Sequence, residues 1–164
     1  MRTRLALALA ILVTAAGCAS SHSPTSATTA TIADVHGQFS GTYTVASCVA
    51  AGDFNGFCEA AGFSSGTTLP ISLSLTQSGS TVSGTVTLGS VSGTFQGTVS
   101  GGTLTGTATM TTPPNDGFTL NLSIANWSTT FTGDSFNGSF SLVFSASSLS
   151  GSATLTATIA RLSR

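Results

Sequence analysis

The stretch Val82-Ser83-Gly84-Thr85-Val86-Thr87-Leu88-Gly89-Ser90-Val91-Ser92-Gly93-Thr94-Phe95 contains two alternating segments with a turn signal between them. In each segment, apolar residues or glycine alternate with serine or threonine, which is the period-two pattern of a strand with one buried face. The two-residue gap Gly89-Ser90 is typical of a β-hairpin. The stretch therefore predicts two antiparallel strands that share one apolar face.

The same alternation recurs from Gly37 almost to the end of the chain. Six segments have the order apolar, small polar, glycine, serine or threonine, then apolar or alanine: residues 39–43, 82–86, 91–95, 104–108, 136–140 and 149–153. Two alternating segments lack the glycine: residues 69–75 and 118–124. Turn-forming residues separate most of these segments, at 78–80, 89–90, 100–102 and 113–117. Because gaps this short exclude most parallel crossovers, we predict eight antiparallel strands in meander order.

These strands have one face of Val, Leu, Ile, Phe and Gly, and another almost entirely of Thr and Ser. Eight antiparallel strands with a single apolar face close best into an up-and-down β-barrel, filled by side chains or holding one small ligand. A β-sandwich of the same strands is the alternative all-β fold. A transmembrane barrel is disfavoured, because the apolar face carries Gly and Ala and lacks aromatic girdles. We expect the barrel domain to span residues 37–164.

The first 17 residues have the organisation of a secretory signal peptide. Arg2 and Arg4 precede an apolar run from Leu5 to Ala16, and small residues follow. The segment Thr14-Ala15-Ala16-Gly17-Cys18 resembles the lipobox of bacterial lipoprotein precursors, with Ala15 where that family prefers Leu. The resemblance implies cleavage before Cys18 and lipidation of its thiol. An ordinary secreted protein with a free Cys18 is the alternative.

Residues 18–36 consist mainly of Ser, Thr and Ala, lack periodicity, and are predicted to form a flexible tether. The lipoprotein resemblance implies anchoring in a membrane of the bacterial cell envelope through Cys18. Ala19 stands where that family uses Asp for inner-membrane retention. In a Gram-negative host the resemblance therefore implies the periplasmic face of the outer membrane.

Charged residues make up only 5% of the chain, which excludes several classes of function. So few positive charges offer no electrostatic footprint for nucleic acid. The five acidic residues are scattered, and His22 and His36 lie in or beside the tether, so a serine or cysteine nucleophile has no base. We therefore expect neither an enzyme nor a metal or cofactor site.

Cys48 and Cys58 are the cysteines that remain when Cys18 is assigned to lipid. Export places them in an oxidising compartment, where a disulfide is the default. They lie in a long connection from Ala46 to Thr68, and connections of this length are usually functional or disordered. The disulfide argues against disorder.

The connection also carries Phe54, Phe57 and Phe63, for which two interpretations remain. The phenylalanines either plug one end of the barrel or form the lid of a ligand site. Strand parity places them at the end opposite the tether. Tyr43 and Trp127 are candidate hydrogen-bond donors to a ligand, unless they bond within the protein.

The strand number, the meander order and the start of the first strand resemble calycin-like barrels, the lipocalin and avidin group. The Gly-x-Trp motif of that group resembles Gly37-Gln38-Phe39 and Gly41-Thr42-Tyr43, in which Phe or Tyr replaces the Trp. The resemblance covers residues 37–162. It implies that the first long loop covers the barrel mouth, as in lipocalins.

The resemblance also concerns Arg161, which strand parity places on the inner face. Lipocalins pack an Arg on the first-strand Trp, so Arg161 is expected to form a cation–π contact with Phe39 or Tyr43. Biotin binding is not implied, because avidin pockets use several Trp and this chain has one. We expect a membrane-anchored lipoprotein whose barrel binds a small apolar ligand. A structural or protein-interaction lipoprotein with a filled barrel is the alternative.

Overall fold

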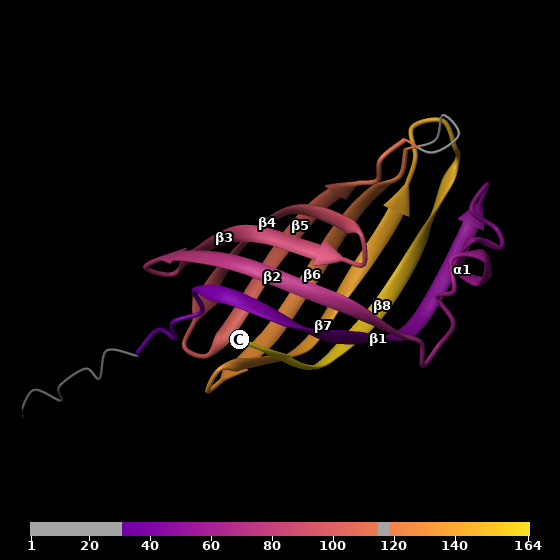
Figure 1. The fold of residues 1–164 in the computed structure, drawn as a ribbon. Coiled ribbons are helices and arrows are strands. Elements are labelled where there is room, and N and C mark those ends of the chain that lie inside the picture. The colour runs from indigo at the N-terminus through magenta and orange to yellow at the C-terminus, as the bar shows by residue number, and fades with distance from the viewer. Residues whose placement is uncertain (1–30, 115–118) are drawn as a thin grey trace, which may run out of the picture.

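The computed structural model describes residues 31–114 and 119–164. The predicted signal peptide, Cys18 and Phe118, the first residue of the predicted segment 118–124, lie outside the described residues. The described part of the chain forms a closed barrel of eight antiparallel strands in which each strand pairs with the next and the last pairs with the first (Figure 1). The predicted meander barrel is confirmed, and the β-sandwich alternative is excluded.

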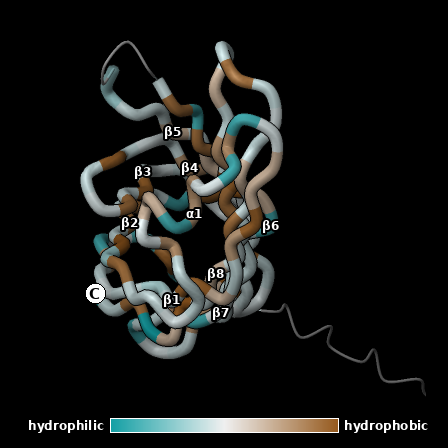
Figure 2. The backbone as a smooth tube through the Cα atoms, turned by 90° about the vertical axis from the view of Figure 1, so that its right-hand side faces the viewer, coloured by the Kyte–Doolittle hydropathy of each residue, from teal (hydrophilic) through white to brown (hydrophobic). Residues whose placement is uncertain are grey.

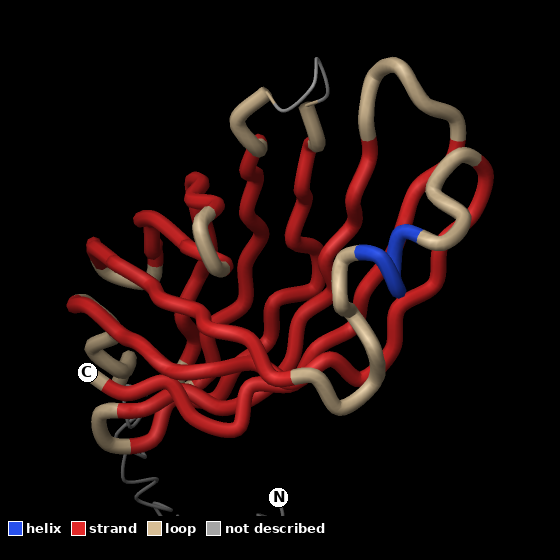
Figure 3. The backbone as a smooth tube through the Cα atoms, turned by 45° about the vertical axis from the view of Figure 1, so that its right-hand side comes forward, coloured by secondary structure: helices blue, strands red, loops and turns tan. Residues whose placement is uncertain are grey.

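The strands follow one another with short connections, except after the first and the fifth. They are β1 (Gly37–Gly52), β2 (Thr68–Ser78), β3 (Thr81–Leu88), β4 (Val91–Ser100), β5 (Thr103–Thr111), β6 (Asn121–Thr132), β7 (Ser135–Ser145) and β8 (Gly151–Ser163). A short helix, α1 (Phe57–Ala60), lies between β1 and β2 and is drawn in blue in Figure 3.

The predicted alternation separates the two faces of the barrel wall. Val82 and Val86 on β3 are fully buried, whereas Ser83 and Thr85, which lie between them in the sequence, are exposed. Figure 2 shows hydrophobic and hydrophilic residues alternating along the strands. Burial of the apolar face is the main force that closes the sheet on itself, since the outer face is already suited to water.

An aromatic stack fills the middle of the barrel. The Trp127 ring stacks on Phe140 with centroids 5.4 Å apart, and Phe95 meets Trp127 edge-on at 5.5 Å. Tyr43 packs against the other side of this group, 5.4 Å from Phe140. The Trp127 indole N–H donates to the Thr129 hydroxyl at 3.0 Å, so its polar atom is satisfied inside the core.

Gly106 on β5 makes room for this stack. A Cβ atom at this position would lie 2.5 Å from the Phe95 ring and 2.6 Å from the Gln96 carbonyl oxygen. Both distances are shorter than van der Waals contact, so a side chain here would push the ring or the neighbouring strand away. The inner-face glycine therefore allows β4 and β5 to coil tightly around a large aromatic residue.

The segment before β1 closes one end of the barrel. Val35 is fully buried, and its backbone N–H donates to the Gln77 side-chain oxygen at 2.7 Å. The Gln77 amide donates in turn to the Ala33 carbonyl at 3.0 Å. Residues 33–36, predicted to be part of the tether, thus pack on the barrel. We call this the closed end.

Arg164 fastens the same end. Its guanidinium lies over the Phe39 ring, 5.2 Å from the centroid, and 5.8 Å from that of Phe131. It donates to the carbonyl of His36 at 2.6 Å and to the Asp134 carboxylate at 3.1 Å. The side chain therefore joins β1, β6, the turn after β6 and the segment before β1.

The predicted contact of Arg161 with Phe39 or Tyr43 is wrong. A register shift between β1 and β8 pairs Tyr43 with Ile159 but Thr42 with Arg161, so Ala160 is an extra residue. This bulge reverses the side-chain parity that follows it. Arg161 is consequently exposed, with its Nε donating to the Ser163 hydroxyl, and Leu162 is buried.

The two arginines provide a matched test of this assignment. Arg164→Ala is expected to lower the free energy of unfolding by about 1–2 kcal/mol, because it removes charge-assisted hydrogen bonds and a cation–π contact. Arg161→Ala is expected to change it by less than about 0.5 kcal/mol, as for an ordinary surface residue. Urea denaturation of both variants checks the difference. Equal effects would show that Arg164 does not fasten the closed end.

Candidate functional site

The opposite end of the barrel, which we call the mouth, is covered by the segment between β1 and β2. β1 is longer than predicted and continues to Gly52, so the connection itself comprises residues 53–67 rather than starting at Ala46. Figure 3 shows this connection and α1 lying beside the ends of the strands. We call residues 53–67 the lid.

An aromatic cluster attaches the lid to the mouth. The Phe57 ring lies 4.9 Å and the Phe63 ring 5.3 Å from that of Phe144 on β7, measured between centroids. Phe54 is only 2% exposed and packs on Phe57 at 5.5 Å. The three predicted phenylalanines are therefore brought together, and Phe144 is their partner in the barrel wall.

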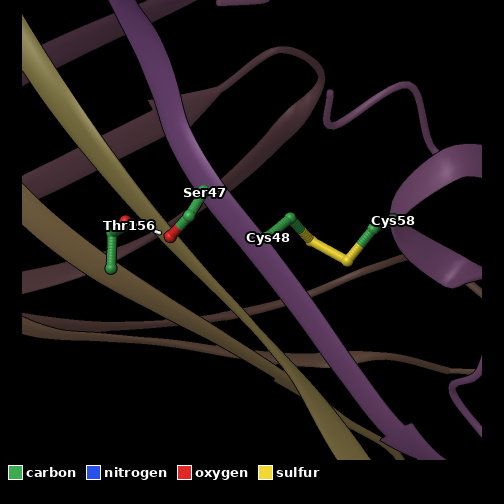
Figure 4. The surroundings of a disulfide bond; sticks show 4 residues. All are labelled: Ser47, Cys48, Cys58 and Thr156. Carbon is green, nitrogen blue, oxygen red and sulfur yellow. Dashed lines mark hydrogen bonds between the residues drawn. A yellow bond between two sulfur atoms is a disulfide. The ribbon is translucent and has the colours of Figure 1, made fainter. Parts of the chain in front are cut away.

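The predicted disulfide between Cys48 and Cys58 is confirmed. It joins β1 to α1, with the two Cα atoms 5.9 Å apart (Figure 4). The neighbouring Ser47 points the other way, and its hydroxyl lies 2.7 Å from that of Thr156 on β8. The alternation of side chains along β1 thus directs Cys48 towards the lid.

A second tie holds the start of the lid. The Asp53 carboxylate accepts hydrogen bonds from the backbone N–H of Ser150 at 2.8 Å and from its hydroxyl at 2.9 Å. The Asp53 N–H donates back to the Ser150 carbonyl at 3.0 Å. The bonds from Ser150 favour the charged carboxylate and lower the pKa of Asp53. The lid is therefore fixed both to β1 and to the β7–β8 connection.

Between the lid and the aromatic stack lies a cavity of about 340 Å³. Its lining is mainly apolar and none of the described lining residues is charged; Tyr43, Phe57, Phe63, Leu69, Leu122 and Phe144 are among them. Gly89 and Ser90, in the β3–β4 turn, also line it and are exposed, so the cavity opens to solvent between this turn and the lid. We call it the mouth cavity.

Tyr43 supplies a polar group to the mouth cavity. The residue is 3% exposed, and no hydrogen bond joins its hydroxyl to another described residue. Every fully enclosed polar side-chain atom in the described part of the chain has a partner, so this hydroxyl is not fully enclosed. Tyr43 lines the mouth cavity, and we infer that its hydroxyl faces this space. Burial raises the pKa of Tyr43 to about 12.

Tyr43 is the single tyrosine of the chain, which makes its pKa directly measurable. The ultraviolet absorbance of tyrosinate is expected to rise with a midpoint near pH 12 in the folded protein. In urea the midpoint should return to about pH 10, the ordinary value. The contribution of Tyr43 to stability is therefore constant below about pH 10 and decreases as the pH rises towards 12, because only the unfolded chain ionises there. A folded-state midpoint near 10 would contradict the burial of this hydroxyl.

Of the other predicted site residues, Phe57 and Phe63 line the mouth cavity, whereas Phe54 and Trp127 do not. Phe54 lies outside the mouth cavity and lines a second hollow of about 590 Å³ with Asp53 and Leu149; Phe57 borders both. Trp127 does not line the mouth cavity, and its N–H is already bonded to Thr129. Of the candidate donors, Tyr43 alone belongs to the site. The sequence placed Leu122 and Phe144 inside the barrel without showing that they lie at its mouth.

A larger hollow, of about 840 Å³, lies on the outer face across β3 to β6. Its lining includes exposed hydroxyl and amide side chains such as Ser83, Gln96 and Asn126. This hollow is more open to solvent than the mouth cavity, so it would enclose less of a small ligand. The mouth cavity is the better candidate site.

Comparison with family models, curated proteins and solved structures gives no match for this chain. Within residues 31–114 and 119–164, no group of three or more His, Cys, Asp or Glu side chains is arranged to hold a metal ion. No helix in this part of the chain is long and apolar enough to cross a membrane.

Proposed function

We propose that this protein is a lipid-anchored barrel of the bacterial cell envelope that binds a small apolar ligand in the mouth cavity. The observation that carries the proposal is the hydroxyl of the buried Tyr43, which is bonded to no other described residue and lies in a mainly apolar cavity. Small-molecule sites are concave, mainly apolar, and contain a few polar groups that orient the ligand. The cavity volume of about 340 Å³ lies within the range of about 300–1,000 Å³ that is typical of such sites.

The architecture supports a binding barrel of the calycin type. Eight strands in meander order close on themselves, and one end is sealed by Val35 and Arg164. The contact of Arg164 with Phe39 is similar to the arginine contact of lipocalins, although it comes from a different residue than predicted. A barrel with one sealed end and one covered mouth is suited to holding a single small molecule.

Anchoring through Cys18 rests on the lipobox resemblance. The described chain starts beside the closed end, since residues 33–36 pack there. A membrane anchor before this segment leaves the mouth facing away from the membrane, where a ligand can diffuse in. Metabolic labelling with palmitate tests this part: the label should be lost in Cys18→Ser, and retained label would contradict anchoring at this residue.

Native mass spectrometry of the protein purified from its own host tests the binding function. We expect a co-purified small molecule or, after its removal, saturable binding of apolar compounds. Leu69→Trp, which fills part of the cavity, should abolish binding, whereas Val49→Trp should not, because Val49 is 68% exposed. If no compound binds, the barrel is a filled structural or interaction domain, which is the alternative function.

A further inference from the structure

We propose that the mouth cavity selects a neutral ligand with a short alkyl chain and one hydrogen-bonding oxygen, such as a ketone, ester or alcohol, and discriminates against carboxylates. This inference rests on the proposed function and adds the chemical class of the ligand. Three features of the cavity carry it: its volume, the position of its polar groups, and the charges around the mouth.

The volume sets the size of the ligand. At about 30 Å³ for each water-sized group, a cavity of about 340 Å³ holds about ten non-hydrogen atoms. The aromatic stack of Phe95, Trp127 and Phe140 fills the barrel below Tyr43, so the ligand cannot extend further inwards. A medium-length alkyl chain fits this space, whereas a long acyl chain would have to extend out through the opening beside Gly89 and Ser90.

Three side chains of the lining carry a hydroxyl group, Tyr43, Ser90 and Thr112, and of these Tyr43 alone lies at the inner end of the cavity. Ser90 lies in an exposed turn at the rim, and Thr112 lies just past the end of β5, where its hydroxyl accepts a hydrogen bond from the Leu120 N–H at 3.0 Å. The Tyr43 hydroxyl is bonded to no other residue in the described part of the chain, so it can donate to a ligand oxygen or accept from a ligand hydroxyl. A ligand without such an oxygen leaves a buried hydroxyl without a partner, which is unfavourable.

The charges around the mouth disfavour an anion. No described residue of the cavity lining is charged, and the charged side chains of the lid are Asp53 and Glu59, which are both negative. Arg164 and His36 lie at the closed end, and Arg161 is exposed on the part of β8 nearest that end. A carboxylate inside the cavity would therefore lack a counter-ion, and burial of an unpaired charge is costly.

The protonation state of Tyr43 agrees with this chemistry. Because burial raises the pKa of Tyr43 to about 12, the phenol stays neutral throughout the physiological range. It can therefore act as a hydrogen-bond donor to a carbonyl oxygen at any pH that the cell envelope meets.

Calorimetric titration of the mature protein with three probes tests the proposal. The probes are 2-nonanone, octanoate with the same number of non-hydrogen atoms, and decane, which has no oxygen. We expect octanoate to bind at least about tenfold more weakly than 2-nonanone. Tyr43→Phe should weaken 2-nonanone about threefold to tenfold, the contribution of one hydrogen bond, and should strengthen rather than weaken the binding of decane, because no hydroxyl is then left without a partner. Thr42→Ser, on the exposed face of the same strand, is the control and should affect no probe.

The outcomes separate this inference from the proposed function. If all three probes fail to bind, both are wrong. If octanoate binds as tightly as 2-nonanone, or Tyr43→Phe leaves 2-nonanone unchanged, the cavity binds apolar molecules without the proposed selectivity. The comparison of 2-nonanone with octanoate needs no variant, so the proposal stays falsifiable even where Tyr43→Phe does not fold.

Discussion

Replacing Trp127 by alanine is expected to lower the free energy of unfolding by about 3–5 kcal/mol, the usual cost of removing a large buried aromatic residue. The side chain is 1% exposed and contacts the rings of Phe95 and Phe140. Its removal leaves a cavity in the middle of the barrel and also removes the N–H that donates to the buried Thr129 hydroxyl. The surrounding strands are closed in a ring and can relax little to fill the space.

Urea denaturation followed by circular dichroism measures this effect, since the variant lacks the single tryptophan needed for fluorescence. Trp127→Phe is the matched variant: it keeps an aromatic ring in the stack and should lose less than Trp127→Ala. Val49→Ala, at a site that is 68% exposed, should change stability by less than about 0.5 kcal/mol. A loss below about 1 kcal/mol for Trp127→Ala would mean that the stack is not tightly packed.

The barrel could be predicted because the features that define it, alternating residues and short turns, are visible within short stretches of the sequence. The alternation around Gly84 and Gly93 fixes which face is buried, and the Gly89-Ser90 turn fixes the antiparallel pairing. One-residue shifts of register would expose a whole apolar face, so the pattern allows few alternatives. The disulfide was predicted equally directly, because Cys48 and Cys58 are the pair that remains when Cys18 is assigned to lipid.

Bulges account for what could not be predicted. The extra residue Ala160 in β8 exchanges the faces of Arg161 and Leu162, and no feature of the sequence marks it. In β6 a register shift lies between Ala125 and Ser128, and Asn126 adopts a positive φ of 55° there. Strict alternation along either strand therefore fails beyond the bulge. For this reason Arg161 was wrongly predicted to face the inside of the barrel.

The mouth cavity could not be predicted from the sequence, because it depends on how side chains that are distant in the sequence pack together. The parity of Phe95, Phe140 and Phe144 shows that all three point inwards, but not how their volumes are distributed along the barrel axis. In the structure Phe95 and Phe140 fill the middle with Trp127, while Phe144 is held at the rim by the lid. The empty space remains between them because the lid keeps Phe57 and Phe63 above it.

Removal of the disulfide that holds this lid, in the double variant Cys48→Ser and Cys58→Ser, should lower the free energy of unfolding by about 2–3 kcal/mol. The cysteines are 10 residues apart, and the bond restricts this short loop in the unfolded chain. In the folded state the lid would keep its ties at Asp53 and Phe57 but lose its covalent link to β1. Limited proteolysis should therefore become faster within residues 53–67, while the closed end stays protected.

Ser47→Ala is the matched control, because Ser47 precedes Cys48 on β1, points away from the lid and is exposed. It should change neither stability by more than about 0.5 kcal/mol nor the proteolysis of the lid. Reduction of the native protein with dithiothreitol should reproduce the behaviour of the double variant. If the double variant keeps its melting temperature and its resistance to proteolysis, the hydrogen bonds of Asp53 and the aromatic cluster alone hold the lid closed. In that case access to the mouth cavity depends on the exposed gap beside Gly89 and Ser90 rather than on movement of the lid.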